Sequence, residues 1–153
     1  MKLGDVLKKE RELRGISLEQ AASTLGITET AYRLMEDGNS LAERWGPLLA
    51  QIAIKLGTPT SRLISETGRS DGAQKGACGR LIKQHRERKQ RSPADVAAAL
   101  ELSREAYDQI EDGESPVEEF GPLLLRFAEL IEQPIFNLFY PCSLPLEKLK
   151  DYP

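Results

Sequence analysis

The chain has 153 residues, of which 40% are apolar and 29% charged, and its net charge is −3. This is the composition of a water-soluble folded protein, and neither a membrane-spanning run nor the apolar core of a signal peptide is present. The two cysteines are far apart in the sequence and there is a single histidine, which excludes a disulfide framework and an ordinary zinc site, so we expect a cytoplasmic protein without metal or cofactor.

The first predicted element is a helix over residues 3–14, because apolar residues recur there at the spacing of one helix face. The second helix begins after Ser17, which forms a capping box with Gln20 three residues later. It is expected to end at Gly26, since glycine accepts a left-handed backbone. A third helix follows Thr28, whose hydroxyl suits the N-cap position.

This third helix is predicted to end at Gly38, because glycine is common just past a helix end. Two prolines, Pro47 and Pro59, then indicate where a fourth helix and a short fifth helix begin, since proline fits the first turn of a helix. No alternating apolar pattern predicts a strand. This part of the chain therefore predicts five helices and no sheet.

The same elements follow a second time at an offset of 75 residues. Residues 4–64 and 79–139 are identical at 21 positions without an insertion. The clearest match is between AYRLMEDGNS (31–40) and AYDQIEDGES (106–115). We interpret this pattern as an internal duplication, because each copy is long enough to form a small domain.

The duplication divides the chain into a series of predicted domains. Residues 1–64 form the first domain and residues 79–140 the second. Residues 65–78 are rich in Gly, Ser and polar residues, which predicts a flexible linker. Residues 141–153 are an unrepeated C-terminal tail. The predicted fold class is all-α, with two tandem domains of five helices each.

The stretch ISLEQAASTLGITETAYRLMEDG resembles the signature of the Cro/CI-type helix-turn-helix family, also described as XRE-like or lambda-repressor-like. IAIKLGTPTSRLI resembles the last two helices of that family, and the second copy repeats both features. The resemblance implies two lambda-repressor-like domains and a transcriptional regulator whose third helix enters the major groove of double-stranded DNA. Family members bind palindromic sites as dimers, so two copies in one chain imply a pseudo-dimer.

The resemblance also implies which side chains of the third helix contact bases. An arginine there suits guanine, a glutamine adenine and a carboxylate cytosine, although each side chain is equally consistent with an ordinary solvated surface. Tyr32 and Tyr107 are expected in the core. Because the two helices carry different residues, we expect an asymmetric site. The candidates are Glu29, Thr30, Arg33 and Leu34 in the first copy, and Arg104, Glu105, Asp108 and Gln109 in the second.

Basic residues on and just after the first helix of each copy are candidate phosphate contacts, since cations position a protein on the DNA backbone. The alternative is a solvated face with local ion pairs, such as Arg11 with Glu12. The candidates are Lys8, Lys9, Arg11 and Arg14 in the first copy, and Lys83, Arg86, Arg88, Lys89 and Arg91 in the second.

The alternative to DNA binding is a protein-interaction module. It would use the same helix-turn-helix scaffold and bind a protein partner through its acidic second domain, and two features favour it. The family usually has glutamine after the serine that opens the second helix, whereas this chain has Leu18 and Pro93. Residues 79–153 hold 10 Lys and Arg against 14 Asp and Glu, a net charge of −4. An enzyme is not expected, because no phosphate loop or nucleophile–base pair is recognisable.

An apolar cluster closes the second copy and extends into the tail. We predict that it completes the core of the second domain, with docking onto the first domain or a homodimer interface as alternatives. Cys142 is expected to be a half-buried structural thiol rather than a redox sensor. The cluster comprises Ile135, Phe136, Leu138, Phe139 and Tyr140, with Leu144 and Leu146.

Overall fold

The computed structural model describes residues 1–63 and 76–142. Within these residues every regular element is a helix, as the sequence predicts. None of the described helices is long and apolar enough to cross a membrane. The predictions for the linker at residues 64–75 and for the tail at residues 143–153 lie outside the described residues, as do those for the side chains of Phe136 and Tyr140.

The helices of the first half (residues 1–63) recur in the second half (residues 76–142) in the same order. The first half contains α1 (Leu3–Leu13), α2 (Leu18–Leu25), α3 (Glu29–Glu36), α4 (Ala42–Leu56) and α5 (Thr60–Leu63). The second half contains α6 (Ala77–Arg88), α7 (Pro93–Ala99), α8 (Arg104–Glu111), α9 (Val117–Leu130), α10 (Phe136–Phe139) and the short 3-10 turn η1 (Tyr140–Cys142). Helix α6 thus begins inside the predicted linker.

The helix boundaries follow the predicted capping residues. The Ser17 hydroxyl accepts a hydrogen bond from the Gln20 backbone at 3.0 Å, and the Gln20 side chain accepts one from the Ser17 backbone at 3.0 Å. Thr28 and Ser103 cap α3 and α8, each accepting from the amide three residues later at 3.1 Å. Glu101 has a φ of 58° where Gly26 has 73°, so the second half has the same turn without a glycine.

The long helices α4 and α9 begin a turn earlier than predicted, and their prolines lie inside them. The Ser40 hydroxyl accepts from the Ala42 amide at 3.0 Å, and the Ser115 hydroxyl accepts from the Val117 amide at 3.3 Å. These serines support the earlier start. Pro47 is tolerated in the helix because its missing N–H removes a single hydrogen bond near the N-terminal end.

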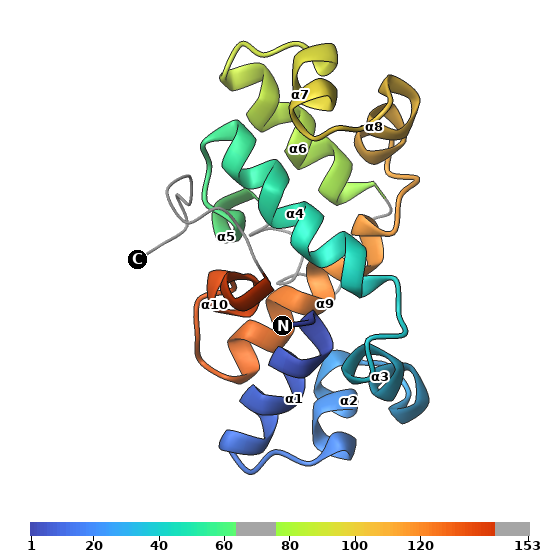
Figure 1. The fold of residues 1–153 in the computed structure, drawn as a ribbon, viewed down its shortest axis with the longest axis vertical. Coiled ribbons are helices and arrows are strands. Elements are labelled where there is room, and N and C mark those ends of the chain that lie inside the picture. Colours follow the sequence, from blue (N-terminus) through green and yellow to red (C-terminus); the bar gives the residue numbers. More distant parts are fainter. Residues whose placement is uncertain (64–75, 143–153) are drawn as a thin grey trace.

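The packing of the helices runs across the two halves. Helix α2 of the first half contacts α9, and α7 of the second half contacts α4. In the same way α1 contacts α10, and α6 contacts α5. Helices α4 and α9 cross each other at the centre of the molecule (Figure 1). The domain division at residues 64 and 79 remains a prediction from the sequence, because each three-helix unit packs against the long helices of both halves: α1 contacts α4 and α2 contacts α9, while α6 contacts α9 and α7 contacts α4.

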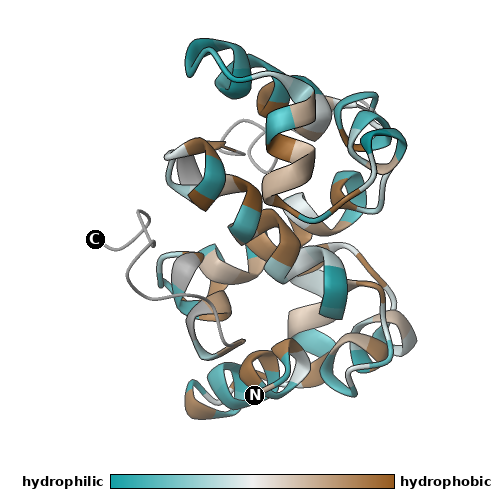
Figure 2. Ribbon diagram, turned by 45° about the horizontal axis from the view of Figure 1, so that its top comes forward, coloured by the Kyte–Doolittle hydropathy of each residue, from teal (hydrophilic) through white to brown (hydrophobic). Residues whose placement is uncertain are grey.

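The main contacts between the halves are reciprocal: α4 crosses α9, the α2–α9 contact corresponds to α7–α4, and the α1–α10 contact corresponds to α6–α5. Helix α10 also contacts α4, whereas its counterpart α5 packs on α4 of its own half. Reciprocal contacts of this kind define an isologous interface, which is built around a two-fold axis. In Figure 2 the hydrophobic residues gather on the facing sides of the central helices, and the outer turns are more hydrophilic. The reciprocal contacts therefore indicate an approximate two-fold relation between α1–α4 and α6–α9 near the crossing of α4 and α9, from which α5 and α10 depart.

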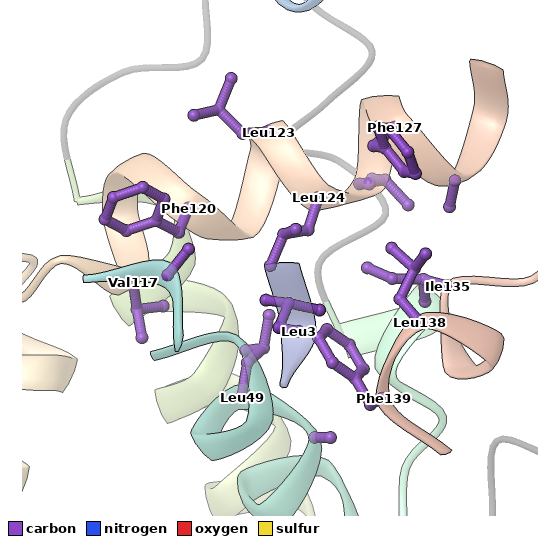
Figure 3. Packing of buried hydrophobic residues seen from close by; sticks show 14 of the residues in the cluster. Leu3, Leu49, Val117, Phe120, Leu123, Leu124, Phe127, Ile135, Leu138 and Phe139 are labelled. Carbon is purple, nitrogen blue, oxygen red and sulfur yellow. The ribbon is translucent and has the colours of Figure 1, made fainter. Parts of the chain in front are cut away.

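Close packing at this crossing depends on a glycine. A Cβ atom at Gly46 would lie 2.8 Å from Leu3 Cδ2, 3.0 Å from Leu124 Cδ1 and 3.3 Å from Phe139 Cε1. Figure 3 shows Leu3, Leu124 and Phe139 gathered at this point, next to Leu49 from α4. Side chains from both halves thus fill one continuous core.

The prediction that the apolar cluster at residues 135–140 completes the core of the second half is wrong. Ile135, Leu138 and Phe139 are buried, but the helix that carries Leu138 and Phe139, α10, contacts α1 and α4 of the first half. The reason is geometric, because α9 crosses α4 and carries the chain to the far three-helix unit. Docking onto the first half, the alternative, is what the structure contains.

Candidate nucleic-acid interface

Helices α3 and α8, which we call the reading helices, lie on the same side of the molecule and towards its two ends (Figure 1). The C-terminal ends of α1 and α6 point to the opposite side (Figure 1). The two reading helices therefore form one face, which is the candidate interface for DNA.

Each reading helix is held by a buried tyrosine, as predicted. Tyr32 on α3 and Tyr107 on α8 are fully buried, and burial raises the pKa of both phenols. The Tyr32 ring stacks on Phe127 of α9 with the ring centroids 6.4 Å apart. The first reading helix is thus anchored partly by the second half of the chain.

A buried ion pair joins α1 to the end of α3. Arg11 Nε donates to Glu36 Oε2 at 2.6 Å, and Nη2 donates to Glu36 Oε1 at 3.1 Å. Arg11 Nη1 also donates to the Ile16 carbonyl at 2.8 Å. This hydrogen bonding to Glu36 raises the pKa of the Arg11 guanidinium. Arg11 is 9% exposed and Glu36 is 8% exposed, so the pair fixes the position of α3.

The second half repeats this pair. Arg86 Nε donates to Glu111 Oε2 at 2.7 Å, Nη2 to Oε1 at 3.1 Å, and Nη1 to the Arg91 carbonyl at 2.8 Å. Arg86 is 7% exposed. The guanidinium groups of Arg11 and Arg86 therefore pair with a distant glutamate rather than with the next residue, and their contact with phosphate stays a prediction.

The base-reading candidates lie on the outer surface of the reading helices. Glu29, Thr30 and Arg33 are exposed on α3, and Leu34 is 45% exposed. On α8, Glu105 and Gln109 are exposed. These side chains point away from the core, although their contact with bases stays a prediction.

Arg104 and Asp108 form an ion pair along α8. Arg104 Nε lies 3.0 Å from Asp108 Oδ1, and the side chains are 56% and 48% exposed. A pair so exposed adds little to stability, because water screens the charges. Both groups therefore remain accessible to a ligand that approaches α8.

The phosphate candidates divide into two groups. Lys8, Lys9 and Lys83 are exposed on α1 and α6. The other group lies at the C-terminal ends of these helices, on the side away from the reading helices. In that group, Arg88 and Lys89 line a hollow of about 260 Å³ beside the turn at Gly57 to Pro59.

Two further phosphate candidates bind backbone carbonyls of the other half. Arg14 Nε donates to the Ile131 carbonyl at 3.0 Å, and its Nη1 donates to the Glu10 carboxylate at 2.6 Å. Arg91 Nη1 donates to the Lys55 carbonyl at 2.6 Å. These carbonyls lie at the C-terminal ends of α9 and α4, where a cation is favoured by the helix dipole. Both arginines thus link the halves, and their contact with phosphate stays a prediction.

Sequence reasoning missed two carboxylates that orient the helices. Glu43 accepts from the backbone amides of Leu3 and Gly4 at 3.1 and 2.6 Å. Glu118 accepts from those of Cys78 and Gly79 at 3.2 and 2.8 Å. A carboxylate satisfies free amides at the start of a helix. The signal was present, because glutamate occurs at both positions of the repeat.

The described residues contain no group of three or more His, Cys, Asp and Glu side chains arranged to hold a metal ion. Cys142 is half-buried, and its Sγ donates to the Leu138 carbonyl at 3.5 Å. Burial raises the pKa of this thiol to about 11. At neutral pH the group is therefore protonated and a poor nucleophile, which agrees with a structural role.

A family model described as a helix-turn-helix domain matches residues 77–134, which span α6 to α9. The match supports a helix-turn-helix domain in this segment. No curated protein and no solved structure matches the chain. Because helix-turn-helix domains are typical of DNA-binding regulators, the match indicates a regulator of this general class.

Proposed function

We propose that the chain is a cytoplasmic, sequence-specific transcriptional regulator without enzymatic activity, in which two copies of one helix-turn-helix unit bind a single DNA duplex as a pseudo-dimer. The observation that supports this most is the reciprocal packing of the two halves, with α3 and α8 on one face. Dimers of this class read two half-sites about one helical turn, roughly 34 Å, apart. A pseudo-two-fold pair of reading helices suits that geometry.

The crossing of α4 and α9 gives the pseudo-dimer a fixed geometry. Arg14 and Arg91 connect the halves at both ends of the crossing, and Arg126 donates to the Leu25 carbonyl at the end of α2 at 3.4 Å. Reading helices held in this way keep one spacing. We therefore expect strong discrimination between DNA sites whose half-sites are separated by different numbers of base pairs.

Few cations remain to contact phosphate. Lys8, Lys9 and Lys83 are exposed, and three such contacts give a slope of about −3 in a plot of log affinity against log salt. The affinity for DNA is then expected to depend mainly on base contacts and on the high effective concentration of the second unit once the first has bound.

The experiment is selection from a random DNA pool at several salt concentrations, followed by sequencing of the retained DNA. Enrichment of a bipartite motif supports the proposal, and no enrichment at low salt contradicts it. Arg33→Ala removes one candidate guanine contact and is expected to weaken binding by about 1–3 kcal/mol. The control is Arg88→Ala at the far end of α6, which should leave binding unchanged.

A second candidate function has its own observation. Residues 93–119, which include α8, hold nine Asp and Glu and a single Arg, and Glu105, Asp112 and Glu114 among them are exposed. This surface repels phosphate and attracts cations, which favours a basic protein partner. If selection enriches no DNA, a pull-down that captures a basic protein, and loses it on Asp112→Lys with Glu114→Lys, supports this function.

A further inference from the structure

The two reading helices carry opposite charges at equivalent positions. The 75-residue offset aligns Glu29 with Arg104, and Arg33 with Asp108. All four side chains lie on the outer surface of α3 or α8. On each helix the two residues are four positions apart, which puts them on one face. The buried residues of the two helices match, because Tyr32 corresponds to Tyr107 and Glu36 to Glu111, so the reversal is confined to the exposed face.

We propose that these positions read guanine and cytosine in opposite senses, so that the DNA target has two half-sites with G·C pairs reversed at two equivalent positions. The chemistry follows from the major groove, where guanine O6 and N7 accept hydrogen bonds and cytosine N4 donates one. Arg33 and Arg104 suit guanine, whereas Glu29 and Asp108 suit cytosine. This inference rests on the proposed DNA-binding function and specifies its target.

Because of the pseudo-two-fold axis, the reversed charges on α3 and α8 should appear as reversed base preferences in the two half-sites of the DNA target. When a two-fold axis of the protein coincides with that of the duplex, equivalent residues face equivalent positions of the two half-sites. A palindrome has the same base at both of those positions. With Arg33 facing one half-site and Asp108 the other, guanine is preferred in one and cytosine in the other.

A third pair of equivalent exposed positions also predicts opposite base preferences in the two half-sites. Leu34, which is 45% exposed, aligns with Gln109. An apolar side chain suits the thymine methyl group, and glutamine suits the N6 and N7 atoms of adenine. Both choices specify an A·T pair, but with the adenine on opposite strands. We expect thymine opposite Leu34 and adenine opposite Gln109.

The Arg104–Asp108 ion pair does not block these contacts. The two side chains are 56% and 48% exposed and meet at 3.0 Å, so water already competes for them. A base edge in the major groove offers each group hydrogen-bonding partners, and their environment is less screened there than on the free surface. The ion pair holds the two side chains ready on the same face of α8.

The test exchanges the charges on α8 with the double variant Arg104→Glu and Asp108→Arg, which gives α8 the charges of α3. The order Glu then Arg four residues later is the more favourable one on a helix, so folding is retained and can be checked by circular dichroism. Selection from the random pool is expected to yield a site that is palindromic at the two positions. Affinity for the wild-type site should fall about 30-fold or more, since two base contacts are lost.

The matched control is Glu29→Arg with Arg33→Asp, which should also give a palindromic site at these positions but with guanine and cytosine exchanged. A wild-type motif that is already palindromic there, or a motif unchanged by both exchanges, overturns this inference and leaves the proposed function intact. If wild-type protein enriches no DNA, the proposed function fails and this inference fails with it.

Discussion

Truncation of Phe127 tests the packing of the long helices across the halves. Phe127 is a residue of α9 in the second half, yet its ring stacks on Tyr32 of the first half at 6.4 Å and is almost fully buried. Phe127→Ala leaves a cavity beneath the first reading helix. Changes of this type cost about 3–5 kcal/mol, of which the ring pair accounts for about 0.5–1.5 kcal/mol.

Hydrogen exchange measured by mass spectrometry locates this loss. Amides in α1, α2 and α3 are expected to exchange faster in Phe127→Ala, because local opening of this unit becomes easier. A loss of 3 kcal/mol corresponds to about a 100-fold increase in exchange rate. Amides in α7 and α8, although they belong to the same half as Phe127, should change much less.

The matched control is Ile52→Ala, because Ile52 occupies the equivalent position on α4 and is fully buried. Helix α4 contacts α7, so this change should accelerate exchange in α6 to α8 at a cost of about 2–5 kcal/mol. If Phe127→Ala instead loosens α6 to α8, and Ile52→Ala loosens α1 to α3, each half has its own core and the reasoning is refuted.

Three further predictions follow from buried groups. Gly4→Ala should cost about 1–3 kcal/mol in chemical denaturation, because its Cβ would meet the Met35 and Glu36 carbonyl oxygens; an unchanged midpoint would contradict this contact. Glu36→Ala should cost about 3–5 kcal/mol, since it strands the buried charge of Arg11, and Glu36→Leu combined with Arg11→Met should recover most of this loss. Alkylation of Cys142 should be slow at pH 7 and rise about tenfold per pH unit up to its pKa of about 11; fast alkylation at pH 7 would refute the buried thiol.

Local structure was readable from the sequence because short-range interactions determine it. Ser17 and Thr28 each cap a helix by accepting a hydrogen bond from the amide three residues later. A serine or threonine just before an apolar helical pattern can be recognised from the sequence alone. The sequence does not indicate the early start of α4, because proline is common in the first turn of a helix and Pro47 predicts a start at its own position. The Ser40 hydroxyl accepts from the Ala42 amide at this earlier start, and Pro47 lies inside the helix, where a single hydrogen bond is lost.

The packing partners of the long helices were not readable. Both contain the sequence GPLL at equivalent positions, from Gly46 and from Gly121, so either helix presents nearly the same apolar face to either three-helix unit. Because the two copies are so similar, the sequence does not show that α9 packs against α2 and that α4 packs against α7. Periodicity indicates that a face is buried, but it does not say against which copy.

The exposed face of the candidate site was predictable, whereas the roles of its arginines were not. Arg11 and Arg86 look like surface cations in a basic helix. Their partners, Glu36 and Glu111, lie 25 residues away and could be paired with them only once the helices were placed. Arg11 and Glu36 are identical to Arg86 and Glu111 at the 75-residue offset. Identity of both partners in the two copies is the feature of the sequence that indicates a buried pair.

Hydroxyl-radical footprinting on the selected DNA site shows whether the two reading helices bind one duplex from the same face. The account predicts two protected stretches on the same face of the duplex, with their centres about 10 base pairs apart. Arg33→Ala should weaken protection in one stretch and Gln109→Ala in the other. A single protected stretch, or two stretches on opposite faces of the duplex, would contradict the account.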